Sequence, residues 1–246
     1  MRASTRHQLK HDRFAETVTG TAADTFSWVS DHRTRMIIGA VVAVVVVGGA
    51  IGGWFYYQQQ NDKANLAFGQ ATRTYQTPIR PAGIPAVPDL PSFASANERS
   101  QAARKEFAAI ADQYPHTPVG HIARYFVGIT YKDVGDYASA EKELKDVVSG
   151  GNKDVAALAK YALASIYAAT NRNAEAVKEY KDLIDHPTDS VAKSTAQLEL
   201  AALYEQIQQP AEAAKVYAEL TKDDPKGPVA QFAQSKLTAL NHPANR

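Results

Sequence analysis

Three tyrosines recur at a nearly constant interval in the C-terminal half of this 246-residue chain. Tyr131, Tyr167 and Tyr204 are 36 and 37 residues apart. A small residue lies three positions before each tyrosine and another nine positions after it, and a large apolar or aromatic residue follows four positions later. The three sets are Gly128, Ala164, Ala201; Ala140, Ala176, Ala213; and Leu144, Tyr180, Tyr217. Self-similarity at a period of this length indicates a repeat array.

Turn-forming stretches divide each repeat into two halves. They are Gly135–Asp136, Asn171–Arg172–Asn173 and Gln208–Gln209–Pro210. Each unit is therefore predicted to be two antiparallel helices of about a dozen residues, within the usual helix lengths. The small residues let the paired helices approach closely, and the large residues fill the gap to the next unit. A single pair buries too little surface to be stable alone, so the units must stack. The predicted fold is an all-α solenoid.

This pattern resembles the tetratricopeptide repeat family. The small and large positions match that family, and Pro225 lies where the family places a proline after the second helix. The third unit, from Ser194 to Pro225, matches best. Arg124, Lys160 and Gln197 depart from the pattern, because the family often has tryptophan there. The resemblance covers residues 96–246 and implies a domain that binds other proteins.

Half-repeats flank the three units. Ala103, Phe107, Ile110 and Pro115 reproduce a second helix, and Pro228–Leu240 is expected to be a capping helix. A helical pattern over residues 58–76 is a candidate partner for the first of these half-repeats. Between them, prolines at 78, 81, 85, 88 and 91 predict an extended loop, because proline does not fit a helix interior. Residues 58–95 are thus expected to be a juxtamembrane helix and a Pro-rich loop.

A different signal lies upstream, where residues 36–57 form an apolar segment. Met36 to Phe55 contains no charged residue, and this length is close to the roughly 20 residues that a helix needs to cross a bilayer. Basic residues precede the segment, and the aromatic run Trp54–Tyr57 closes it. The positive-inside rule then places residues 1–35 in the cytoplasm and the chain after about residue 58 outside. The rival reading is a cleavable signal peptide that ends near Gly48–Gly49–Ala50.

The leader, residues 1–35, carries apolar residues at near-helical spacing. They are Phe14, Val18, Ala22, Phe26 and Val29. An amphipathic helix on the membrane surface and a loosely ordered tail both fit this pattern.

The order of these parts resembles a second, narrower family, the ancillary subunit of the bacterial Sec translocon. A cytoplasmic leader, one anchor, the run Gly53–Tyr57, an Ala-rich helix and degenerate repeats carry the resemblance. It implies a single-pass protein of the bacterial inner membrane with a periplasmic repeat domain. The implied partners are translocon subunits and a membrane-anchored prolyl-isomerase-like chaperone, with the lipid bilayer around residues 36–57. The Pro-rich insertion departs from that family. The alternative is a structural scaffold of another envelope assembly.

No pattern in the chain predicts catalysis, a cofactor or a metal site. Cysteine is absent, the seven histidines show no HExxH spacing, and no phosphate-binding glycine motif occurs. A net charge of +1 and a pI near 7.9 argue against nucleic-acid binding. Acid pairs such as Glu141/Glu143 and Asp223/Asp224 are expected on solvated faces or in turns. We therefore expect a protein that is not an enzyme.

The predicted binding site is the concave face, which the first helix of each pair lines in such arrays. Helical periodicity places eight residues there: Tyr125, Ile129, Lys132, Tyr161, Ser165, Leu198, Ala202 and Glu205. Exposed tyrosines suit peptide binding, because they bury a large area while few torsions are frozen. The alternative for any one of these residues is that it packs between helices.

Overall fold

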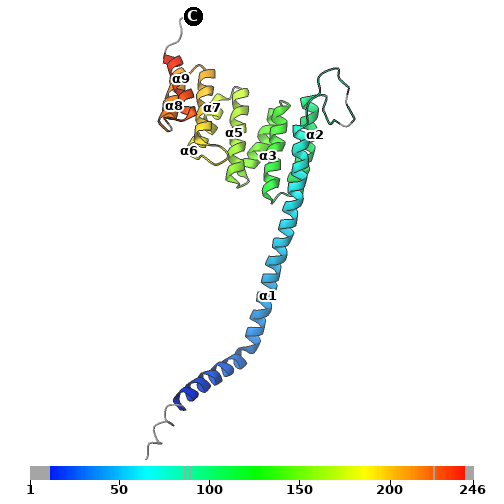
Figure 1. Cartoon of the computed structure of the whole chain (residues 1–246), viewed down its shortest axis with the longest axis vertical. Coiled ribbons are helices and arrows are strands. Elements are labelled where there is room, and N and C mark those ends of the chain that lie inside the picture. Colours follow the sequence, from blue (N-terminus) through cyan, green and yellow to red (C-terminus); the bar gives the residue numbers. More distant parts are fainter. Residues whose placement is uncertain (1–11, 86, 89, 224, 242–246) are drawn as a thin grey trace, which may run out of the picture. The chain divides into compact units, whose positions relative to one another are not determined.

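A computed structural model describes residues 12–85, 87, 88, 90–223 and 225–241, with side chains at residues 33–35 and, within those ranges, from Ile37 to Leu240. Over the described residues the chain forms nine α-helices and no strand beyond isolated bridges, which confirms the all-α prediction (Figure 1). The helices are α1 (Asp12–Gln76), α2 (Ala96–Gln113), α3 (Pro118–Asp133), α4 (Tyr137–Ser149), α5 (Lys153–Ala169), α6 (Asn173–Asp185), α7 (Lys193–Gln206), α8 (Pro210–Asp223) and α9 (Pro228–Asn241).

The chain divides into two compact units, residues 1–58 and 59–246. In the first unit, α1 carries the apolar segment, whose valines and isoleucines are exposed; Val44, for example, is 71% exposed. From Arg33 onward, α1 is long and apolar enough to cross a membrane, with a mean hydropathy of 2.4 over its most apolar window. The leader residues from Phe14 to Val29 lie on the α1 backbone, but their side chains are outside the described set.

In the second unit, helices pair as antiparallel hairpins, α3 with α4, α5 with α6 and α7 with α8, and α9 packs on α8. The tight turns inside the hairpins are equivalent. Each contains one residue with a positive φ, namely Gly135 (80°), Asn171 (59°) and Gln208 (59°). The next N–H donates to the carbonyl of the repeated tyrosine, at 3.0 Å from Asp136, 2.8 Å from Arg172 and 2.8 Å from Gln209. This left-handed ending satisfies carbonyls that the first helix leaves free.

The small residues of the repeat lie where the helices meet. Ala140, Ala176 and Ala213 are fully buried, as are Ala164 and Ala201. At Gly128 a Cβ atom would lie 2.7 Å from the Leu144 Cγ, so the close approach of α3 and α4 depends on glycine. Every large residue of the repeat is buried too: Leu144, Tyr180 and Tyr217. The burial predicted for the small and large positions of the repeat is confirmed. Of the large residues, Tyr217 also packs on the following helix, against Phe232 of α9.

The first hairpin pairs residues 59–76 of α1 with α2. Phe68 and Tyr75 of α1 pack against Phe107 of α2, with ring centroids 5.5 and 6.3 Å apart, and Thr74 donates to Glu106 at 3.0 Å. The candidate partner of the first half-repeat is therefore the helix on the other side of the Pro-rich loop.

The Pro-rich loop is closed at its base by backbone hydrogen bonds. The Arg80 N–H donates to the Phe93 carbonyl at 2.9 Å, and the Phe93 N–H donates to the Pro78 carbonyl at 3.0 Å. Insertion of the loop thus leaves the helix pair intact.

Candidate protein-binding surface

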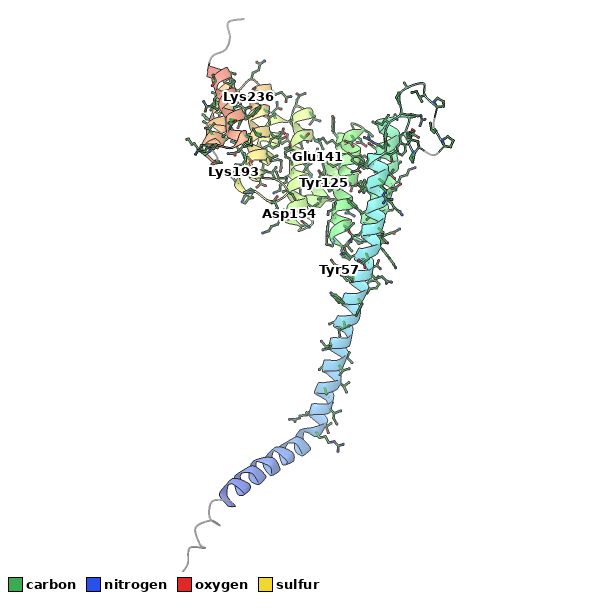
Figure 2. All side chains as sticks on the ribbon, viewed as in Figure 1. Tyr57, Tyr125, Glu141, Asp154, Lys193 and Lys236 are labelled. Atoms are coloured by element: carbon green, nitrogen blue, oxygen red, sulfur yellow. The ribbon has the colours of Figure 1, made fainter. Side chains whose placement is uncertain are left out.

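Tyrosines from three successive first helices form a row, which we call the tyrosine row: Tyr75 of α1, Tyr125 of α3 and Tyr161 of α5. Tyr75 and Tyr125 both pack edge-on against Phe126, and Tyr125 is close enough to Tyr161 to influence its pKa. Tyr125, labelled in Figure 2, and Tyr161 are 36 residues apart and occupy equivalent positions in their repeats. All three rings are partly buried. Helix stacking therefore aligns residues that are far apart in sequence.

Two carboxylates orient this row. The Tyr75 hydroxyl donates to Asp133 of α3 at 2.6 Å, and the Tyr161 hydroxyl donates to Glu199 of α7 at 2.9 Å. Burial, followed by the hydrogen bond to Glu199, raises the pKa of Tyr161 to about 12. Burial and then the neighbouring Asp133 also raise the pKa of Tyr75 and of Tyr125. At neutral pH these phenols are uncharged, and those of Tyr75 and Tyr161 act as donors.

A cleft of about 340 Å³ lies beside Tyr161, where α5, α6 and α7 meet. Tyr180 of α6, only 3% exposed, borders this cleft and packs edge-on against Tyr161 with ring centroids 6.0 Å apart. The other lining residues are Leu203 and a set of small or polar residues: Ser165, Ala168, Ala169, Glu199, Ala202 and Gln206. The small side chains leave room for a guest side chain.

The eight residues predicted for the concave face have different environments. Tyr125 and Tyr161 belong to the tyrosine row, and Ser165 and Ala202 line the cleft. The Ile129 and Leu198 side chains are partly buried against the core, and Lys132 is partly exposed near the end of α3.

Glu205 is the one acidic residue among the eight, and its carboxylate binds side chains of two other helices. It accepts the Tyr217 hydroxyl of α8 at 2.6 Å and the Lys236 ammonium of α9 at 3.0 Å. Its role in the structure is to hold the capping helix to the third hairpin.

Sequence reasoning missed Tyr75, Asp133 and Glu199 as members of this surface. Tyr75 lies before the Pro-rich loop, outside the range 96–246 assigned to the repeats. Asp133 and Glu199 directly follow the predicted residues Lys132 and Leu198. The surface therefore includes residues next to those that helical periodicity places on the concave face. The signal available was the step Ala71–Tyr75, which continues the helical pattern of residues 58–76.

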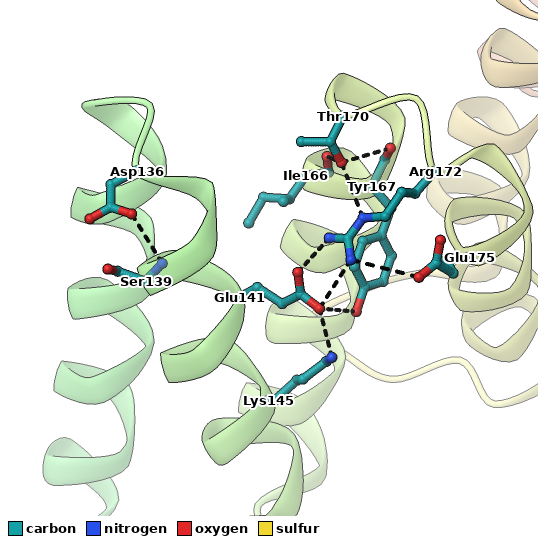
Figure 3. A network of polar contacts seen from close by, with 9 residues as sticks. All are labelled: Asp136, Ser139, Glu141, Lys145, Ile166, Tyr167, Thr170, Arg172 and Glu175. Atoms are coloured by element: carbon teal, nitrogen blue, oxygen red, sulfur yellow. Dashed lines mark hydrogen bonds and ion pairs between the residues drawn. The ribbon is translucent and has the colours of Figure 1, made fainter.

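A polar network joins α4 to the hairpin of α5 and α6 (Figure 3). The Glu141 side chain, 18% exposed, accepts hydrogen bonds from both terminal nitrogens of Arg172, from Lys145 at 2.6 Å and from Tyr167 at 3.3 Å. The Arg172 guanidinium lies 4.3 Å from the Tyr167 ring centroid. The hydrogen bond from Arg172, aided by Lys145, lowers the pKa of Glu141 to about 2.

We expect Glu141→Gln to lower the free energy of unfolding by about 1–2 kcal/mol at neutral pH, because it removes the charged acceptor of Arg172. The folded pKa lies below the ordinary value of 4.5, so wild-type Glu141 contributes its full stabilisation above that value. This contribution is lost as the pH falls from about 4.5 towards 2, and the variant lacks this loss. Denaturant titration of the full chain at several pH values measures both effects.

Glu143→Gln is the matched control, because Glu143 lies on the same helix and makes no ion pair with the residues described. Identical acid sensitivity in the two variants would contradict the assignment to Glu141.

Stacked helical hairpins with a capping helix define an α-solenoid. A family model described as a tetratricopeptide repeat-like domain matches residues 27–242, and the chain belongs to this family. Such repeat domains are protein-interaction modules and typically non-enzymatic scaffolds. Among the described residues, no group of three or more His, Asp or Glu side chains could hold a metal ion.

Two solved structures share the fold. One contains the nearly identical TPR-like repeats of a putative kinesin light chain from Podosopora anserina. Its sequence is 16% identical to this chain, the TM-score is 0.54, and the match covers 74% of this chain and 87% of that one. A point variant of the same repeats is 17% identical with a TM-score of 0.53, covering 74% and 86%. A tetratricopeptide repeat protein from Parabacteroides merdae is 18% identical with a TM-score of 0.46; the match covers 59% of this chain and 55% of that protein. No curated protein sequence matches the chain.

Proposed function

We propose that this chain is a single-pass protein of a bacterial inner membrane that serves the Sec translocon as a non-enzymatic interaction subunit. In this proposal residues 36–57 cross the bilayer, the leader is cytoplasmic and the repeats are periplasmic. The tyrosine row and the cleft contact secreted or membrane proteins as they emerge, together with translocon subunits or a membrane-anchored chaperone.

The observation that carries the proposal is the extent of the family match. One family model begins at residue 27, upstream of the apolar segment, and continues through all the repeats to residue 242. The matched region therefore contains the apolar helix as well as the repeats. A permanent anchor accounts for this extent because it stays in the working protein, and the cleavage test below distinguishes it from a signal peptide.

The flanks of the apolar segment support the same orientation. Arg33 and Arg35 precede it, whereas the first charges after it, Asp62 and Lys63, cancel. An excess of basic residues on one side favours the cytoplasm for that side. The aromatic run Trp54–Tyr57 is typical of a helix end at the membrane interface.

The absence of cysteine makes the topology directly testable. Single-cysteine variants Ser4→Cys in the leader and Ser149→Cys in the exposed end of α4 are treated in spheroplasts with a membrane-impermeant maleimide. We expect labelling of the second variant alone, and labelling of the first only after the membrane is permeabilised. Labelling of the leader in intact spheroplasts, or a chain shortened by cleavage near Ala50, would refute the anchor.

The partner is tested by photo-crosslinking in intact membranes. A photoreactive residue at Ser165 in the cleft is compared with one at Glu219, an exposed position of α8. Capture of translocon subunits or emerging chains from Ser165 alone supports the proposal. If only components of another envelope assembly are captured, the chain is a scaffold and the translocon proposal fails.

A further inference from the structure

The charge at the cleft beside Tyr161 restricts the kind of guest that it can hold. Its lining includes one acidic residue, Glu199, and no basic residue. Three other clefts of the repeat domain all contain basic residues in their linings: Arg104, Lys105 and Arg124 in the first, Lys153 and Lys160 in the second, and Lys181 and Lys215 in the third. The cleft between α5 and α7 therefore differs from these three in its charge.

Glu199 is also free to bind a cation. Its side chain accepts the Tyr161 hydroxyl at 2.9 Å, and no Lys, Arg or His among the described residues forms an ion pair with it. Glu205 and Asp182, by contrast, are paired with Lys236 and Lys160. A neutral phenol fixes the orientation of the Glu199 carboxylate without neutralising its charge.

The tyrosine row has a second oriented carboxylate. Asp133 accepts the Tyr75 hydroxyl at 2.6 Å, and no cation is paired with it among the residues described. Lys132 is the adjacent cationic residue on α3, and it does not line the cleft. The row thus repeats one arrangement at two places, a tyrosine hydroxyl that donates to a carboxylate on the next first helix. The two places differ in charge, because the Arg99 guanidinium lies 5.6 Å from the Tyr75 ring centroid.

We propose that this surface binds extended polypeptide segments that carry lysine or arginine, and that the cleft between α5 and α7 receives one such side chain. The aliphatic stem lies along Ala168, Ala169 and Ala202, beside the Tyr161 and Tyr180 rings, and the charged head meets Glu199. Long basic side chains pair an apolar stem with a charged tip in this way, and aromatic rings attract cations. The inference deepens the proposed function and rests on its protein-binding surface.

Segments of other character fit less well. An acidic side chain would meet the Glu199 carboxylate without a neutralising cation, which is repulsive. A purely apolar side chain would fill the alanine-lined part but leave Glu199 desolvated without a partner.

Three peptides of equal length test the proposal, with lysine, glutamine or glutamate at the same alternate positions of one alanine–leucine background. Binding to the full-length protein in nonionic detergent is followed by fluorescence anisotropy. We expect the lysine peptide to bind most tightly, with an affinity that falls as salt is added. Glu199→Gln should weaken the lysine peptide about fivefold and leave the glutamine peptide unchanged, as expected for one partly exposed ion pair.

Two further variants complete the experiment. Glu219→Gln removes an exposed carboxylate of α8 and should change nothing, whereas Glu199→Lys should shift the preference towards the glutamate peptide. Equal binding of all three peptides, or lysine-peptide binding that Glu199→Gln leaves unaltered, overturns the charge preference while leaving protein binding in place. Failure of every peptide to bind overturns the inference too, and crosslinking from Ser165 then decides separately whether the proposed function survives.

Discussion

Replacing Phe107 with alanine is expected to lower the free energy of unfolding of the first hairpin by about 3–5 kcal/mol, the usual cost of deleting a buried phenylalanine. Phe107 is 0% exposed and stacks on Phe126 of α3, with ring centroids 4.9 Å apart and an interplanar angle of 19°. It also contacts Phe68 and Tyr75 of α1. One side chain therefore joins three helices, and its removal leaves a cavity that none of them can easily fill.

The loss should be local, because stacked repeats interact mainly with their neighbours. The buried residues form two clusters, one around Phe107 and a larger one from α4 to α9, with partly buried Tyr131 packed against both. Hydrogen exchange of the full-length protein should rise in α2 and in residues 59–76 of α1, while α7 and α8 stay protected.

Phe232→Ala is the matched control, because Phe232 of α9 is 49% exposed and its deletion should have a small effect. A uniform loss of hydrogen-exchange protection through all the repeats, or an equal effect of the two alanine variants, would contradict the division of the buried core into two clusters.

The repeat unit could be predicted from sequence because its determinants are local. The interval between Tyr131, Tyr167 and Tyr204 fixes where each first helix ends, and all three hairpins use the same left-handed turn after it. Gly and Asn adopt that conformation readily, and Pro210 begins the next helix, so all three turns could be predicted from the sequence. Gln208 shows that a repeat's register can impose the same turn on a less suited residue.

The partner of α2 was harder to identify, because it depends on a contact across the Pro-rich loop. Neither the length nor the proline content of a loop says where the next helix will dock. The decisive information is the aromatic cluster that Phe68, Phe107 and Phe126 form in three dimensions. Since no repeat motif marks residues 59–76, the sequence offers this segment only as a candidate partner, and the contacts of Phe68 and Tyr75 with Phe107 confirm it.

Two of the three departures from the family pattern also have a physical reason that spacing alone does not reveal; the structure offers none for the buried Gln197. Lys160 stands where the family often has tryptophan, and it bonds to Asp182 of α6 at 2.5 Å. Arg124 similarly faces Asp112 of α2 at 3.9 Å. At both positions an ion pair between neighbouring helices replaces aromatic packing, and recognising such a pair requires knowing both helices.

Replacing Gly120 with alanine is expected to destabilise the junction between α2 and α3 by about 2–4 kcal/mol, through overpacking and loss of a helix cap. A Cβ atom at Gly120 would lie 2.0 Å from the Tyr114 carbonyl oxygen, which is backbone and cannot rotate away. The Thr117 hydroxyl donates to the same carbonyl at 2.9 Å and accepts the Gly120 N–H at 3.0 Å. Any shift that relieves the clash therefore disturbs the N-terminal cap of α3.

The same substitution at two other glycines provides comparisons for the effect expected at Gly120. Gly69 of α1 has no atom within 4 Å of a built Cβ, so Gly69→Ala should stabilise the chain by up to about 1 kcal/mol through helix propensity. Gly128→Ala should lie between the two, because its obstacle is the Leu144 side chain, which can shift at some cost. Denaturant titration of the three full-length variants measures the series. If Gly120→Ala proved as harmless as Gly69→Ala, α3 could not start against the Tyr114 carbonyl as described, and the packing of the first hairpin on the second would have to be redrawn.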